Sequence, residues 1–126
     1  MNEPRAEEVR KILAAADQIV TSDLTLIECD RVLYRAVATS GLSEAGAVEL
    51  RGALMTAART WHVLHVIDEV VERARLPFPA EPVRALDAIH LSSALVAAGA
   101  VTDVRVLTLD SRVRVNARAL GLPTVP

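Results

Sequence analysis

The sequence predicts an α/β fold in which short parallel strands alternate with helices that cover both faces of a sheet. Hydrophobic residues make up 52% of the 126 residues, which is enough apolar material for one core. Short β-branched runs alternate with longer segments of helical periodicity, and strands separated by helices favour parallel pairing. The length fits one domain, so we expect residues 1–126 to form a single unit.

Helical periodicity and capping residues define the elements of the first half of the chain. Val9, Ile12 and Leu13 recur at helical spacing. Ser22 is a good N-cap for the helix that follows it, and Gly41 ends that helix. We expect helices over residues 4–16, 24–41 and 43–60, and strands over residues 18–22 and 61–66.

In the second half, a proline cluster separates a short helix from a long apolar one. Pro77, Pro79 and Pro82 stop the first helix, and Gly99 ends the second, which we expect to be the most buried. The run VRVLTL contains no turn former and is long enough for an interior strand. We expect helices over residues 67–76, 83–99 and 111–121, a strand over 104–109 and a short edge strand over 122–126.

The composition excludes several classes of function and location. A net charge of -2 argues against nucleic-acid binding by bulk electrostatics, so any such role must be local. The aromatic residues Tyr34, Trp61 and Phe78 are too scattered to form a stacking platform. Cys29 is the only cysteine, which excludes an intramolecular disulfide. The amino end lacks a secretory signal, and the apolar run 88–102 is too short to span a bilayer, so we expect a cytoplasmic protein.

Three acidic residues lie where an α/β domain could place a site. Asp110 ends a predicted strand, although capping the next helix is an alternative role. Asp87 lies in the first turn of the apolar helix, where the helix dipole alone would favour an acid. Glu28 lies on one helix face with Arg31 and Arg35, which could simply pair with it.

If these acids converge, their charges repel one another, and a divalent cation removes that conflict. Magnesium prefers such oxygen ligands, and metal ions activate water in phosphodiester cleavage, so a polyanionic substrate is implied. The spacing of the histidines suggests no metal site, and we expect structural or surface roles for His62, His65 and His90. Candidate phosphate contacts, with solvated surface charge as the alternative, are Arg31, Arg35, Arg84, Arg112 and Arg114.

The stretches VTSDLTLIECDRVLYRA, LDAIHLSSAL and VLTLDSRVRVNARALGL resemble the PIN-domain family, particularly its VapC-type toxins. The resemblance runs from about Glu3 to Val125. It implies a three-layer α/β/α sandwich on a parallel sheet, and a site of four acids that hydrolyses RNA with magnesium or manganese. It also implies a homodimer and a cognate antitoxin, which would bind near residues 24–38 and 44–59.

By this resemblance, Glu28, Asp87 and Asp110 match the second, third and fourth acids of the family, both as metal ligands and as catalytic residues. Thr108 matches the threonine of a T-x-D motif, which we expect to help fix Asp110.

The sequence departs from the family at its beginning. Members start with a strand of the form Y-L-D-[ST]-[AS], which carries the first acid, and no such strand occurs here. Loss of this central strand would leave backbone groups on its neighbours unpaired. We therefore expect an N-terminally truncated PIN-like domain whose natural reading frame starts upstream. The alternative is a catalytically impaired remnant that acts as an antitoxin-binding module.

Overall fold

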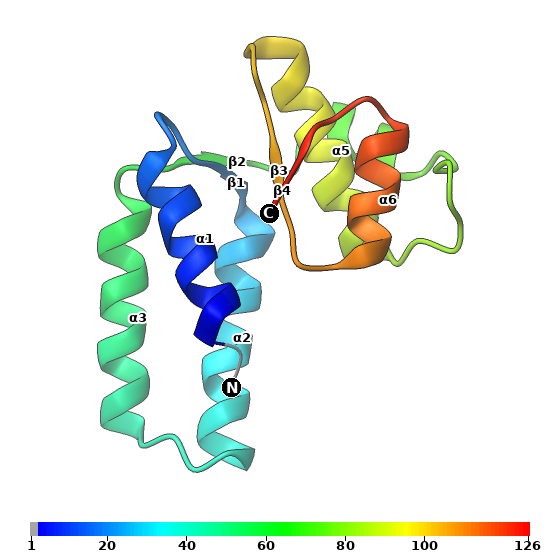
Figure 1. The fold of residues 1–126 in the computed structure, drawn as a ribbon. Coiled ribbons are helices and arrows are strands. Elements are labelled where there is room, and N and C mark those ends of the chain that lie inside the picture. Colours follow the sequence, from blue (N-terminus) through cyan, green and yellow to red (C-terminus); the bar gives the residue numbers. More distant parts are fainter. Residues whose placement is uncertain (1–2) are drawn as a thin grey trace. The chain divides into compact units, whose positions relative to one another are not determined.

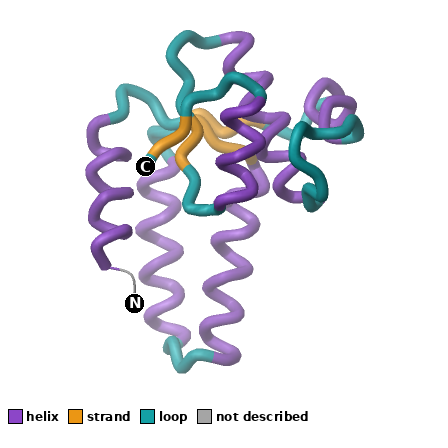
Figure 2. Tube along the Cα trace, turned by 45° about the vertical axis from the view of Figure 1, so that its right-hand side comes forward, coloured by secondary structure: helices purple, strands orange, loops and turns teal. Residues whose placement is uncertain are grey.

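The computed structural model describes residues 3–126, in which short strands alternate with longer helices (Figures 1 and 2). The elements are α1 (Glu3–Ala15), β1 (Val20–Ser22), α2 (Asp23–Thr39), α3 (Glu44–Ala58), β2 (His62–Leu64), α4 (Asp68–Ala74), α5 (Ala85–Ala100), β3 (Val106–Leu107), α6 (Ser111–Ala119) and β4 (Thr124–Val125). Each element predicted from the sequence is present within a few residues of its predicted position. The described chain forms two compact units: Gln18–His65, and the residues up to Asp17 together with Val66–Pro126.

The unit Gln18–His65 consists of a parallel strand pair and a helical hairpin. Strands β1 and β2 pair in parallel, with Thr21 opposite Val63. The backbone then enters α2, where the Ser22 hydroxyl accepts a hydrogen bond from the Leu24 N–H at 3.2 Å. Helices α2 and α3 lie side by side (Figure 1), and the turn between them contains Gly41 at a φ of 75°. The predicted cap and the predicted helix end are therefore confirmed.

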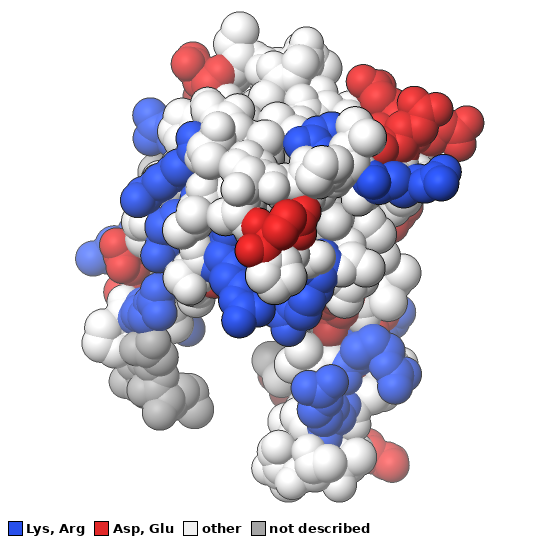
Figure 3. Space-filling model, turned by 90° about the vertical axis from the view of Figure 1, so that its right-hand side faces the viewer, with Lys and Arg blue, Asp and Glu red and all other residues white. Residues whose placement is uncertain are grey.

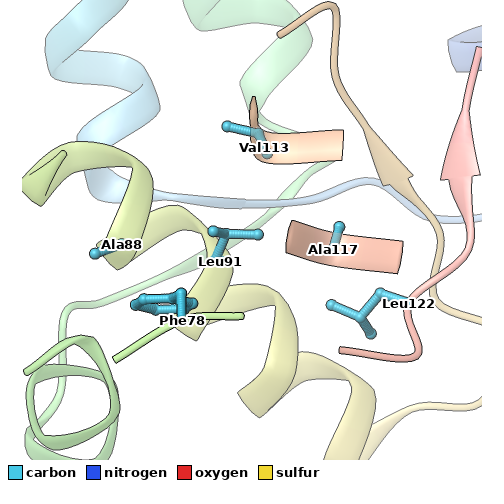
Figure 4. Packing of buried hydrophobic residues seen from close by; sticks show 6 residues of the cluster. All are labelled: Phe78, Ala88, Leu91, Val113, Ala117 and Leu122. Atoms are coloured by element: carbon cyan, nitrogen blue, oxygen red, sulfur yellow. The ribbon is translucent and has the colours of Figure 1, made fainter. Parts of the chain in front are cut away.

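The other unit contains the hydrophobic core. Its central side chains come from the loop before α5, from α5 and α6, and from the segment that leads into β4 (Figure 4). They are Phe78, Ala88, Leu91, Val113, Ala117 and Leu122. Helix α5 has more buried residues than any other described helix, as its apolar sequence predicts. The core thus fixes α5 against α6.

Strand β3 is shorter than the predicted strand over residues 104–109. Only Val106 and Leu107 have strand geometry, and they pair in parallel with Thr124 and Val125 of β4. Beyond them, the Thr108 hydroxyl accepts a hydrogen bond from the Asp110 N–H at 3.1 Å, so the backbone turns toward α6. Strand β4 confirms the predicted strand at residues 122–126. The described strands form two separate two-stranded parallel sheets.

Candidate functional site

Asp110 lies between β3 and α6 and is the N-cap of that helix. Its Oδ1 atom accepts hydrogen bonds from the N–H groups of Arg112 at 2.8 Å and Val113 at 3.1 Å. Thr108 fixes the preceding backbone through the bond to the Asp110 N–H, which confirms the expected role of this threonine. The capping role considered from the sequence is therefore present, and it occupies only one of the two carboxylate oxygens.

The Asp110 carboxyl group has a lowered pKa. The backbone hydrogen bond from Val113 is the largest cause of this lower pKa, and the bond from Arg112 acts in the same direction. The positive charges of Arg84 and Arg112 lower the pKa further, while partial desolvation opposes them. Asp110 is thus held as an anion at neutral pH.

Asp87 lies in the first turn of α5, as predicted. Its side chain is 20% exposed. The residue comes shortly after the loop that ends at Arg84. The Nε atom of Arg84 donates a hydrogen bond to Asp87 Oδ2 at 3.3 Å. Helix α5 therefore places this carboxylate at the margin of the core, beside a cationic partner.

Arg84 also reaches the second acid. Its Nη2 atom lies 3.9 Å from Asp110 Oδ2, so one guanidinium faces both Asp87 and Asp110. We call Asp87 and Asp110 the acid pair. The sequence predicts Arg84 as a phosphate contact or as solvated surface charge, although its position three residues before Asp87 is a spacing at which helical ion pairs form. Two carboxylates that share one cationic group have the oxygen donors that suit one hard cation.

The loop of residues 77–84 is fastened to α6 by Asn116, a buried residue that sequence reasoning missed. The amide Oδ1 of Asn116 accepts a hydrogen bond from the Ala80 N–H at 2.8 Å. Its Nδ2 donates to the carbonyl oxygens of Ala80 and Arg112, each at 3.0 Å. The Asn116 side chain therefore connects the loop that precedes Asp87 to α6, the helix that Asp110 caps.

Glu81 stabilises the same loop by hydrogen bonds to the backbone of the loop itself. Its two carboxylate oxygens accept hydrogen bonds from the N–H groups of Phe78 and Val83, both at 2.7 Å. With Asn116, these contacts leave the segment before α5 little freedom. They explain how a loop that is rich in proline can position Arg84.

Glu28, the remaining predicted acid, lies in α2 and belongs to the unit Gln18–His65. Its neighbour Cys29 has a raised pKa, chiefly because of burial and then because of the negative charges of Glu28 and Asp30. Within residues 3–126, no group of three or more His, Cys, Asp or Glu side chains is arranged to hold a metal ion. The structure brings together Asp87 and Asp110 within one unit, and the part of Glu28 in the site stays a prediction.

The candidate arginines differ in their surroundings. Arg114 donates a hydrogen bond from Nη2 to the Thr108 carbonyl oxygen at 3.0 Å, so its guanidinium has a structural partner. Arg31 lies over the Tyr34 ring, 5.8 Å from its centroid. Figure 3 shows Lys and Arg side chains in several groups on the face that it draws, some of them next to Asp and Glu side chains. This distribution fits a local role for individual arginines.

Two of the predicted surface histidines are exposed. His62 begins β2, and the Nδ1 atom of His65 lies 2.7 Å from Asp23 Oδ2. These contacts fit the structural or surface roles predicted for both. None of the helices in the described part of the chain is long and apolar enough to cross a membrane.

Residues 1–119, a range that contains Glu28, Asp87 and Asp110, match the PIN domain. The chain belongs to the PIN-domain family. This PIN domain is similar to Ribonuclease VapC35 of Mycobacterium tuberculosis, from strain CDC 1551 / Oshkosh and from strain ATCC 25618 / H37Rv. In each case 32% of 106 aligned residues are identical, over 84% of this chain and 70% of the relative. The resemblance to VapC-type PIN domains is confirmed, and with it the α/β fold class.

Proposed function

We propose that this PIN domain is an endoribonuclease toxin of a type II toxin-antitoxin system, which hydrolyses RNA phosphodiester bonds with magnesium or manganese. The observation that carries the proposal is the approach of Asp87 and Asp110 to one shared cationic group inside a PIN domain. The similarity to a protein named Ribonuclease VapC35 supports the reaction class.

In this proposal, Asp87 and Asp110 hold the cation, and Glu28 is a third ligand, as the family resemblance implies. A bound magnesium ion supplies a water of lowered pKa and stabilises the charge on the phosphodiester oxygens. Asp110 contributes a carboxylate whose pKa is lowered, chiefly by the backbone hydrogen bond from Val113. Its Oδ1 stays with the helix N-terminus, which leaves Oδ2 for the cation.

We extend the proposal to the remaining architecture and partners. Residues 1–126 would form one PIN-like domain, a three-layer α/β/α sandwich in the cytoplasm, that works as a homodimer. The cognate antitoxin would bind on residues 24–38 and 44–59. Large apolar side chains on α2 and α3 support such an interface, because they are exposed to water in this chain. They are Ile27, Val32, Tyr34, Val48, Leu50 and Met55.

The test is cleavage of a defined RNA by the protein purified free of antitoxin. We expect cleavage that requires Mg²⁺, and we expect Asp87→Asn to abolish it without a loss of folding by circular dichroism. Arg105→Gln, a change at an exposed residue of the same unit, is the matched control and should cleave like the wild type. Absence of Mg²⁺-dependent cleavage would contradict the proposal. Antitoxin binding without cleavage would instead favour the antitoxin-binding module.

A further inference from the structure

Arg84 faces one carboxylate oxygen, Oδ2, of each member of the acid pair. Its guanidinium approaches Oδ2 of Asp87 at 3.3 Å and Oδ2 of Asp110 at 3.9 Å. Oδ1 of Asp110 is already taken by two backbone N–H groups of α6. A cation shared by the acid pair therefore has to approach Asp110 through the oxygen that Arg84 faces. The guanidinium and the metal ion compete for the same atom.

The side chain of Arg84 can leave without disturbing the helix that it precedes. Arg84 is the N-cap of α5, but it makes no side-chain capping bond there. Its main-chain carbonyl accepts the Ala88 N–H at 2.8 Å, and this bond does not depend on where the guanidinium lies. The side chain is 71% exposed, so water can solvate the guanidinium once it has moved away.

We propose that Arg84 is the resident counter-cation of the acid pair, and that a divalent cation must displace its guanidinium in order to bind. This inference rests on the proposed function, because it assumes that Asp87 and Asp110 are metal ligands. Before the metal arrives, Arg84 reduces the repulsion between the two carboxylates. Once the metal is bound, the guanidinium is repelled from the site, because two positive charges at such close range repel each other.

The experiment measures Mn²⁺ binding to the full chain by electron paramagnetic resonance, which counts free Mn²⁺ and needs no RNA cleavage. We expect Arg84→Gln to lower the Kd for Mn²⁺ about two- to fivefold, the effect of losing one exposed ion-pair partner. Arg84→Lys keeps the positive charge and should stay close to the wild type. Arg105→Gln removes the same charge from an exposed position whose side chain has no acidic partner among residues 3–126, and should leave the Kd unchanged.

Thermal unfolding provides a second measurement. The rise in Tm caused by Mn²⁺ should be larger for Arg84→Gln than for the wild type, because tighter binding stabilises the folded state more. An unchanged Kd together with an unchanged rise in Tm would overturn the displacement proposal while the proposed function stood, since Mn²⁺ would still bind through Asp87. Wild-type Mn²⁺ binding that Asp87→Asn does not weaken would overturn both.

Discussion

At the scale of single residues, Asp110 combines a structural role and a proposed chemical role on two different oxygen atoms. Oδ1 caps α6, and Oδ2 faces Arg84. The first role needs only a hydrogen-bond acceptor, whereas the second needs a negative charge. Substitutions at this position can therefore separate stability from metal binding.

We expect Asp110→Asn to keep most of the stability of the protein and to lose metal-dependent activity. Asparagine is a good N-cap but a neutral one, while Asp110→Ala removes the cap and should cost about 1 kcal/mol. Urea unfolding measures the first effect and RNA cleavage the second. Equal stabilities of the Asn and Ala variants would contradict the capping role.

The lowered pKa of Asp110 also predicts how stability depends on pH. Because the folded pKa lies below the ordinary value of 3.8, the contribution of Asp110 to stability is fully present above that pH. It is lost as the pH falls through the folded pKa. Urea midpoints of the wild type should therefore fall relative to those of Asp110→Asn in this acid range. Parallel profiles for the two proteins would show that the carboxylate gains no stabilisation on folding.

The sequence allowed the positions of Asp87 and Asp110 to be predicted, because a helix start and a strand end are local features. The link between them could not be predicted in the same way. It depends on Arg84 reaching Asp110 across 26 residues of chain, which only the packing of α5 on α6 brings about. Asn116 was missed for a similar reason, since its partner Ala80 lies 36 residues away.

At the scale of elements, the side chain of Asn116 makes the hydrogen bonds that attach the loop of residues 77–84 to α6. Asn116→Ala would leave the N–H and carbonyl groups of Ala80 without their partner. We expect a loss of about 2–3 kcal/mol in the free energy of unfolding, because the buried Asn116 amide loses three hydrogen bonds that each contribute about 1 kcal/mol. Val115→Ala, at an exposed neighbour on α6, is the control and should change stability little. A loss no larger than that of the control would contradict this role.

The positions of the strands could be predicted from the sequence, but the length of β3 could not. The hydrophobic run 104–109 correctly located β3, but it overestimated its length. Hydrogen bonding by Thr108 and capping by Asp110 turn the backbone out of the strand, and these local polar contacts prevailed over β propensity. The helix cap at Ser22 was predictable because it needs only the next few residues.

At the scale of the whole molecule, burial is unevenly distributed between the two units. Among the residues that the structure describes, the buried hydrophobic ones all lie in the unit that contains α5 and α6, whereas α2 and α3 contain no buried residue. The amphipathic patterns predicted helices in both units equally well. They did not predict which helices would be covered, because that depends on contacts between elements distant in sequence.

This difference in burial predicts a difference in local stability. We expect the backbone amides of α2 and α3 to exchange with deuterium faster than those of α5, because fewer buried contacts oppose local opening. Hydrogen-exchange mass spectrometry of the metal-free chain measures this. Similar protection of the two regions would contradict the expectation. Slower exchange in α2 and α3 alone, on addition of a partner, would indicate that the partner covers this hairpin.

The bonds between Asn116 and Ala80 have a consequence for how this protein tolerates change in length. The Asn116 side chain pairs with both backbone groups of one residue, much as a neighbouring strand would. An insertion or deletion between Ala80 and Arg84 would alter the span from this anchor to the first turn of α5. The acid pair would then be spaced wrongly although every acidic residue was retained. We therefore expect natural and engineered variants to accept substitutions in this segment far more readily than changes in its number of residues.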